Sequence, residues 1–272
     1  MKTIIAPTDF SAVSHNACLY AAHMAQDIKA ELILMHVMEL PLAVAEFPVA
    51  GDVIDEISVE AELEKIKNEL IAETNNNVKI EIRNILGSAE YQIKELCKTT
   101  NPFAVIMGTH SYTAIDRFFG STTVYSARHL DNAVLVVPAD VKYKPIKKIA
   151  LATDLKDVYK TPVQEIEILA KYFNARLEIF YIGKDQKDIN KRSIESALLD
   201  HRLSHLNPHF YFVEDEDVIL GITSLAKKHE TDMIIIIPKK HGPFHKSQTK
   251  DCIFYSSIPV LVVHENDFVH QS

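Results

Sequence analysis

Four short polar segments in the first half of the chain carry residue types that suit a phosphorylated nucleoside. Each follows or precedes an apolar run, and together they contain Pro7, Thr8 and Asp9, then Val37, then Met107, Gly108, Thr109 and His110, and finally Gly120, Ser121, Thr122 and Thr123. Asp9 offers a carboxylate to an amino group or a ribose hydroxyl, and Val37 offers an apolar wall to a flat base. Gly108 removes a side chain where a ligand must pass.

The Gly120–Thr123 turn supplies the donors that a phosphate needs. It presents backbone N–H groups and hydroxyls at the start of a helix, where the helix dipole favours an anion. The same residues also have a structural interpretation, because Ser and Thr commonly cap helices and Gly108 can serve a tight turn. We predict nucleotide binding because four segments fit it together.

Apolar runs without alternation are typical of strands buried on both faces of a parallel sheet. In the first half we expect strands at Thr3–Ala6, Glu31–Val37, Val78–Ile85, Ala104–Met107 and Ala133–Val137. In the second half we expect them at Lys148–Ala152, Arg176–Ile182, Pro208–Val213, Met233–Ile237 and Val260–Val263.

Amphipathic segments between these runs predict helices. They are Ser11–Lys29, Ile57–Ala72, Ala89–Thr100, Ser121–His129, Val218–His229, Ser247–Tyr255 and a helix capped by Thr161 with Pro162 at its first position. Strand–helix alternation predicts a doubly wound α/β fold, which binds ligands at the carboxyl ends of its strands. The long connection from Glu39 to Gly51 is expected to cover a site or a partner.

The chain repeats itself. Ile4–Asp9 (IIAPTD) recurs as Ile149–Asp154 (IALATD), and Ala133–Pro138 (AVLVVP) recurs as Pro259–His264 (PVLVVH). We therefore predict two tandem doubly wound domains, each a five-stranded parallel sheet flanked by helices. They span residues 1–140 and 148–272, joined by a linker at 141–147. Both last strands are apolar and would lie at a sheet edge, so we expect them to pair within the chain, with a homodimer left open.

Composition narrows the function classes. The net charge is −8, from 29 Lys and Arg against 37 Asp and Glu, which argues against a nucleic-acid or anionic-membrane partner. The three cysteines form no CxxC pair, and Cys18 and Cys97 are expected to pack on apolar helix faces. With no recognisable signal peptide or membrane-length apolar run, we expect a cytoplasmic protein.

These segments resemble the universal stress protein family in its tandem two-domain form. The resemblance rests on the PTDFS opening, the strand ending in HV, the MGTH segment and the GST turn, and it covers essentially the whole chain. It implies the adenine nucleotide alpha hydrolase-like fold. The ATP-binding members carry Gly, two residues, Gly, nine residues, Gly, then Ser or Thr. Here Gly108 and Gly120 match, Ser111 replaces the middle glycine, and eight residues separate Ser111 from Gly120.

The resemblance implies a role for each matching residue. Asp9 and Val37 would hold the adenosine of ATP, and Gly108 with the Gly120–Thr122 turn would hold its phosphates, with Mg²⁺ accompanying them. The implied function is a nucleotide-responsive stress or signalling regulator. Two alternatives stay open, namely a nucleotide-independent interaction module and a slow ATPase or phosphotransfer enzyme. No catalytic residue is assigned, because no Walker, zinc-protease or nucleophile-elbow motif is present.

The second half departs further from the motif. Asp154 and Ile182 take the places of Asp9 and Val37, but Ile237-Pro238 replaces the glycine after the fourth strand and Lys246 replaces Gly120. Lys246, Ser247 and Thr249 could form a second anion site. We favour a degenerate site with solvated lysines, in a half that is structural or regulatory.

His201, His205 and His209 are spaced by four residues, and the first two could share a helix face as metal ligands. No acidic or cysteine ligand accompanies them in the sequence, so we interpret them as ordinary histidines and predict no metal.

Overall fold

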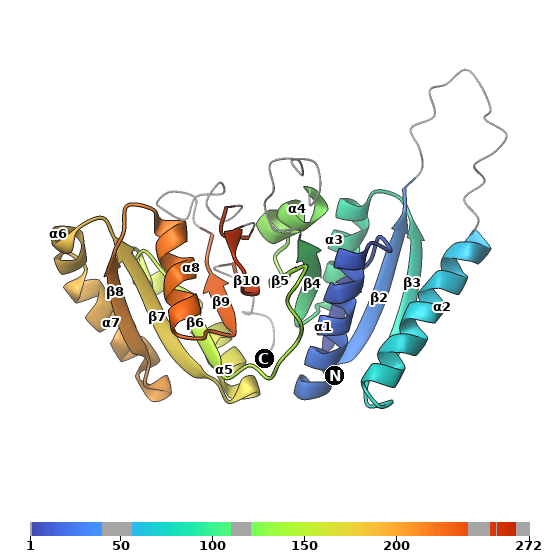
Figure 1. Cartoon of the computed structure of the whole chain (residues 1–272), viewed down its shortest axis with the longest axis horizontal. Helices are drawn as coiled ribbons and strands as arrows, with labels where there is room; N and C mark the ends of the chain where they lie inside the picture. Colours follow the sequence, from blue (N-terminus) through green and yellow to red (C-terminus); the bar gives the residue numbers. More distant parts are fainter. Residues whose placement is uncertain (1, 40–55, 110–120, 239–250, 254, 265–272) are drawn as a thin grey trace, which may run out of the picture.

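The computed structural model describes residues 2–39, 56–109, 121–238, 251–253 and 255–264. Figure 1 shows two halves side by side along the long axis, each with strands covered by helices. The expected Glu39–Gly51 connection after its first residue, and residues 247–250 and 254 of the expected Ser247–Tyr255 helix, lie outside the described residues.

In the first half, the strands are β1 (Thr3–Pro7), β2 (Glu31–Met38), β3 (Ile80–Leu86), β4 (Ala104–Thr109) and β5 (Val134–Pro138). The helices are α1 (Ala12–Ile28), α2 (Glu56–Glu73), α3 (Ala89–Thr100) and α4 (Ser121–His129).

In the second half, the strands are β6 (Lys148–Ala152), β7 (Arg176–Gly183), β8 (His209–Glu214), β9 (Met233–Ile236) and β10 (Val260–Val262). The helices are α5 (Val163–Phe173), α6 (Gln186–Asn190), α7 (Ser193–Leu203) and α8 (Val218–Lys228), with 3₁₀ turns at Val158–Lys160 and Ser204–Leu206. The predicted α/β class is confirmed, and all ten strands lie where apolar runs predicted them.

All ten strands form one sheet, in the order β3-β2-β1-β4-β5-β10-β9-β6-β7-β8. Pairs within each half are parallel, as a doubly wound fold requires. β5 and β10, the last strands of the two repeats, pair in antiparallel orientation with Leu135 opposite Leu261. The two parallel sheets are thus continuous with each other.

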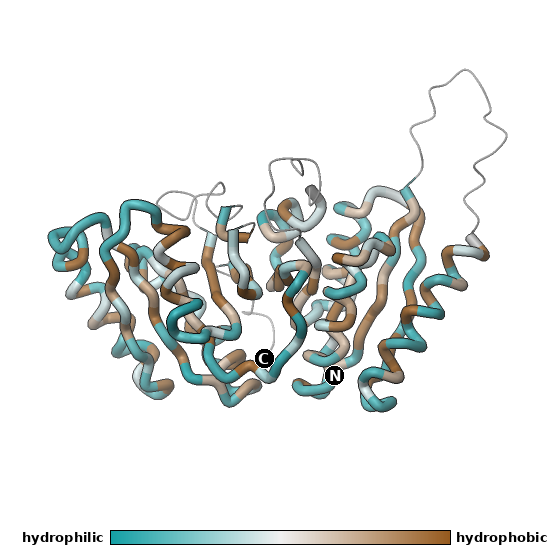
Figure 2. The backbone as a smooth tube through the Cα atoms, viewed as in Figure 1, coloured by the Kyte–Doolittle hydropathy of each residue, from teal (hydrophilic) through white to brown (hydrophobic). Residues whose placement is uncertain are grey.

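Each face of the sheet has its own apolar core, because successive strand residues point to opposite sides. Ile4 belongs to the core under α1, α2, α5 and α7, whereas Ile5 belongs to the core under α3, α4 and α8. Figure 2 shows the resulting pattern, with apolar strands inside and polar positions along the outer helices.

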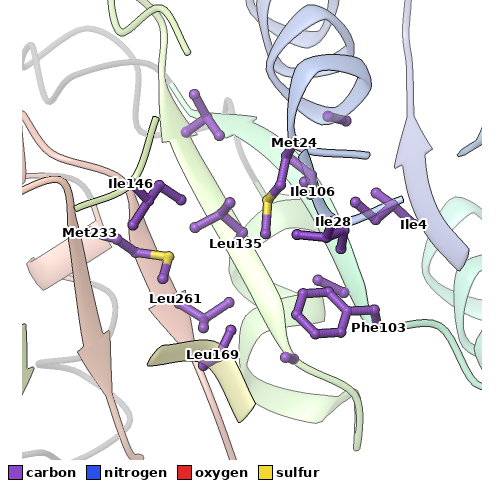
Figure 3. Packing of buried hydrophobic residues seen from close by; sticks show 14 of the residues in the cluster. Ile4, Met24, Ile28, Phe103, Ile106, Leu135, Ile146, Leu169, Met233 and Leu261 are labelled. Atoms are coloured by element: carbon purple, nitrogen blue, oxygen red, sulfur yellow. The ribbon is translucent and has the colours of Figure 1, made fainter. Parts of the chain in front are cut away.

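The first of these cores crosses the junction between the halves. Met24 and Leu135 from the first half lie in the same buried cluster as Leu169, Met233 and Leu261 from the second half (Figure 3). Both halves therefore contribute to one apolar core.

The predicted linker is held by hydrogen bonds at both ends. The Asn16 side-chain amide in α1 donates to the Val141 carbonyl at 2.9 Å. The Asp232 carboxylate accepts from the backbone N–H groups of Lys147 and Lys148 at 2.8 and 2.9 Å. This segment is thereby attached to α1 and to the residue before β9.

The expected start of α5 is wrong by one position. Its N-cap is Pro162 rather than Thr161, and the helix begins at Val163. The Val163 N–H donates to the Thr161 carbonyl at 2.8 Å around a proline with φ −74° and ψ 73°, which is an inverse γ-turn. This turn removes Thr161 from the capping position.

The cysteines are packed as expected. Cys18 and Cys97 are buried, and burial raises the pKa of each thiol to about 12. Among the described residues, no helix has both the length and the apolar character needed to cross a membrane.

The shared core predicts that damage in β10 lowers the stability of the whole chain. Leu261 is buried, so Leu261→Ala should reduce the free energy of unfolding by about 2–5 kcal/mol. Urea unfolding followed by circular dichroism measures this, and Leu220→Ala, at a leucine of α8 that is 57% exposed, is the control expected to change little. Two separate transitions, with the first half unaffected, would contradict a shared core.

Candidate functional site

A cavity of about 620 Å³ lies at the carboxyl ends of β1, β2 and β4. The strand order reverses between β1 and β4, which is where doubly wound sheets bind ligands. The structure brings nine of the predicted site residues to its walls, namely Pro7, Thr8, Asp9, Val37, Met107, Gly108, Thr109, Thr122 and Thr123. His110, Ser111 and Gly120 lie outside the described residues, and Ser121 is described only as the first residue of α4.

The turn from β1 to α1 is built by side chains that hydrogen-bond to nearby backbone. Thr8 Oγ1 accepts from the Phe10 N–H at 3.1 Å, and Asp9 Oδ1 accepts from the Ser11 N–H at 3.0 Å. Ser11 then caps α1 by accepting from the Ser14 N–H at 3.2 Å. Phe10 has a positive φ of 64°, so these bonds hold a sharp turn that leaves Asp9 exposed at the cavity.

The Asp9 carboxylate is charged at neutral pH. Partial burial raises its pKa, but hydrogen bonds from Ser11 and Ser14 outweigh burial and leave the pKa below its ordinary value of 3.8. The turn therefore presents a stable negative charge to the cavity.

The end of β2 supplies His36, which stands directly before the predicted site residue Val37. His36 Nδ1 lies 2.8 Å from the Thr8 carbonyl oxygen, and because a carbonyl only accepts, Nδ1 carries the proton. The Phe10 ring packs on the imidazole with centroids 4.3 Å apart. Val37 follows and is half-buried, as an apolar wall of the cavity.

Position 108 requires glycine because β4 packs closely against α1 there. A Cβ at this position would lie 2.6 Å from the Val13 carbonyl oxygen of α1 and 2.7 Å from Val13 Cγ1. The missing side chain lets β4 pack against α1, whatever passes through the cavity. The Thr123 hydroxyl donates to the Gly108 carbonyl at 3.1 Å, which ties the start of α4 to the same strand.

The sequence model of the universal stress protein family matches residues 1–138. The chain belongs to the universal stress protein family. A universal stress protein from Archaeoglobus fulgidus DSM 4304 has a similar structure, with a TM-score of 0.72 and 16% identity over 97% of this chain and 98% of its own. A functionally unknown protein from Pseudomonas aeruginosa PAO1 matches with a TM-score of 0.62 and 11% identity over 98% and 94%. Among curated proteins, no sequence matches the chain. The structural likenesses establish the fold over both halves.

Sequence reasoning missed nearly half of the residues that line the first cavity of this universal stress protein. They are Ser11, Val13, Ser14, Met35, Met38, Glu39, Val59, Ala89 and Ile93. Most stand at strand ends or in the first turn of a helix. Ser14, one turn after the cap, and Ala89, directly after Gly87-Ser88, could have been found from those positions.

The second half repeats the β1–α1 turn in its hydrogen bonds as well as in its sequence. The Leu155 N–H donates to Thr153 Oγ1 at 3.0 Å, the Lys156 N–H donates to Asp154 Oδ1 at 2.9 Å, and Leu155 has a positive φ of 54°. A cavity of about 350 Å³ lies beside this turn, lined by Asp154 and Ile182 as their alignment with Asp9 and Val37 predicts. Lys246, Ser247 and Thr249 lie outside the described residues.

The histidines spaced by four do not share an α-helix. α7 ends at Leu203, so His201 lies on it and His205 falls in the following 3₁₀ turn. His205 also has an acidic neighbour that the local sequence did not reveal, because its Nε2 lies 3.1 Å from Glu167 Oε1 in α5. In the part of the chain that is described, no three His, Cys, Asp or Glu side chains are grouped to hold a metal ion.

The contact at Gly108 predicts that adding a methyl group lowers the stability more at this position than at Gly221. Gly108→Ala forces the new Cβ against backbone, so it should lower the free energy of unfolding by about 1–3 kcal/mol. Gly221→Ala in α8 is the matched control, because its Cβ would meet side-chain atoms of Ile182 at 2.9 Å and Asp215 at 3.2 Å while gaining helix propensity. Equal stability of the two variants in urea would contradict this explanation.

The Asp9 carboxylate predicts a defined pH dependence. A folded-state pKa below the unfolded one stabilises the fold above the unfolded pKa, and this stabilisation is lost as pH falls through the folded pKa. Asp9→Asn keeps the acceptor oxygen but removes the charge. It should therefore be less stable than the natural chain near neutral pH, with the difference shrinking in acid. A difference that is independent of pH would show that the charge is not responsible.

Proposed function

We propose that the first half, residues 1–140, binds ATP or a related adenine nucleotide in the first cavity. Bound nucleotide would make this universal stress protein a stress-response or signalling regulator. One observation carries the proposal: an ionised Asp9, the apolar wall at Val37 and the start of α4 line the same cavity at the strand-order reversal.

The size and chemistry of the cavity support the adenosine end of this proposal. About 620 Å³ falls within the roughly 300–1,000 Å³ typical of small-molecule sites. The Asp9 carboxylate accepts hydrogen bonds only, which suits ribose hydroxyls or an amino group. Val37 and Met107 offer apolar surface for a base.

The start of α4 supports the phosphate end. The first N–H groups of a helix have no partner inside the helix and carry the positive end of its dipole. Thr122 lines the cavity in this first turn, while Thr123 fixes the turn to β4 through the Gly108 carbonyl. A triphosphate would bring Mg²⁺ as its counterion.

The chemistry of the first cavity suits nucleotide binding better than rapid nucleotide hydrolysis. A carboxylate whose pKa is lowered holds protons weakly and is a poor general base at neutral pH. We therefore propose that any turnover of the nucleotide is slow.

We propose that the second half, residues 148–272, acts as a built-in partner of the first half. The linker at 141–147 connects the two halves. Ser14 lines the first cavity, and Asn16 on the same helix binds the linker carbonyl of Val141. The first cavity and the linker therefore contact the same segment of α1, which supports this role for the second half.

Calorimetric titration of the full chain with ATP and Mg²⁺ tests the proposal. Asp9→Asn should weaken binding about tenfold, because a hydrogen bond to a charged group contributes about 1.5–3 kcal/mol. Ala89→Trp should abolish binding by filling the cavity. Val218→Trp, at the matching first position of α8, is the control that should leave binding unchanged.

Two results would overturn this assignment. The absence of binding to the natural chain would favour a nucleotide-independent interaction module. Loss of binding in Val218→Trp rather than in Ala89→Trp would move the nucleotide to the second half.

A further inference from the structure

We propose that the cavity of the second half binds a small organic anion, in which an apolar or aromatic body of about one ring carries a carboxylate or a phosphate. This ligand would differ from the nucleotide of the first half. The two cavities occupy equivalent places, so their differences can be traced residue by residue.

Backbone register defines the equivalent residues. The Thr8 N–H donates to the Met35 carbonyl, and the Thr153 N–H donates to the Phe180 carbonyl. Phe180 thus stands where the first half has Met35, and Ile182 stands at the position of Val37. Val218 and Ala89 correspond because each is the first residue of its helix.

These three replacements make the second cavity smaller. Phe180, Ile182 and Val218 are each bulkier than their counterparts, and all three line the cavity. Its volume is about 350 Å³ against about 620 Å³ in the first half. The remaining space has an apolar floor and suits a ring-sized body better than a nucleoside with its phosphates.

The charge of the rim is reversed between the halves. Among the described residues lining the first cavity there is no lysine or arginine, and Asp9 and Glu39 give it two carboxylates. In the second cavity Lys156 replaces Ser11 and Lys184 replaces Glu39, and Arg192 is added from the segment between α6 and α7.

Two carboxylates, Asp154 and Asp188, also line the second cavity and offset part of this positive charge. Asp154 is only 4% exposed and accepts from the Lys156 N–H within its own turn. Asp188 lies 3.9 Å from Lys191, a lysine of the rim region that is not a lining residue. Three cations, of which Arg192 is paired with Glu195, therefore face two acids, of which Asp188 is paired with Lys191.

Arg192 is held in place to receive an anion. Its Nη1 lies 3.1 Å from Glu195 Oε1, and its side chain is 23% exposed. A guanidinium has five N–H donors, so further donors are available in a planar arrangement that matches a carboxylate or phosphate. Lys184 lines the same cavity at an exposed position and adds a second positive charge.

The test is calorimetric titration of the full chain with phenyl phosphate, benzoate and inorganic phosphate. Phenyl phosphate or benzoate should bind, and the better of the two identifies the anionic group. Inorganic phosphate should bind much more weakly, because it cannot use the apolar floor. Arg192→Gln should weaken binding by about tenfold or more, while Lys187→Gln, on α6 but not a lining residue, should have no effect.

Two filled-cavity variants separate this site from the first one. Val218→Trp should abolish binding of phenyl phosphate or benzoate, and Ala89→Trp should preserve it. If Arg192→Gln unfolds, Lys184→Gln at an exposed position replaces it and should also weaken binding. The proposal is overturned if neither aromatic anion binds, if binding survives Val218→Trp, or if inorganic phosphate binds equally well. Failure of ATP to bind the first cavity would not affect these outcomes.

Discussion

The antiparallel pairing of β5 with β10 is the contact on which the architecture depends. Val134, Leu135 and Val136 face Val262, Leu261 and Val260, and all six are buried. Two apolar strands that would each be an exposed edge thereby cover one another. The edges that remain are β3 and β8, which carry charged or polar residues such as Glu81, Arg83 and Glu214. The two halves thus form one sheet with two polar ends.

Within that sheet, one set of residues forms the strand-to-helix turn beside each cavity, and a different set forms the cavity walls that contact a ligand. Thr8 and Thr153 accept the same turn hydrogen bond, and Asp9 and Asp154 accept the next one. These local bonds recreate the same strand-to-helix turn without any help from the cavity walls. The walls come from the neighbouring strand and from helix starts, where side chains can change without disturbing the turn. The two halves therefore share this turn while their cavities differ.

Much of this fold was predictable because buried parallel strands leave apolar runs without alternation. Lys148–Ala152 was predicted with its observed bounds, as were the helices Ala89–Thr100 and Ser121–His129. The expected start of α5 failed because an inverse γ-turn at Pro162 competes with helix capping.

The site was only partly predictable, because several of its properties depend on elements far apart in the sequence. The role of Gly108 depends on Val13, some ninety-five positions earlier, which no local pattern reveals. His36 could be placed at a strand end, but its hydrogen bond to Thr8 requires the register of β1 and β2. Arg192 reaches the second cavity because α6, which precedes it in the chain, packs beside β7.

The central claim is that one half of this universal stress protein binds nucleotide and the other has a cavity of a different kind. Native mass spectrometry of the full chain with excess ATP and Mg²⁺ tests it most directly, because it counts bound molecules. The account predicts one ATP per chain at saturation. Two ATP molecules per chain would show that the second cavity is also a nucleotide site, and none would contradict the assignment of the first.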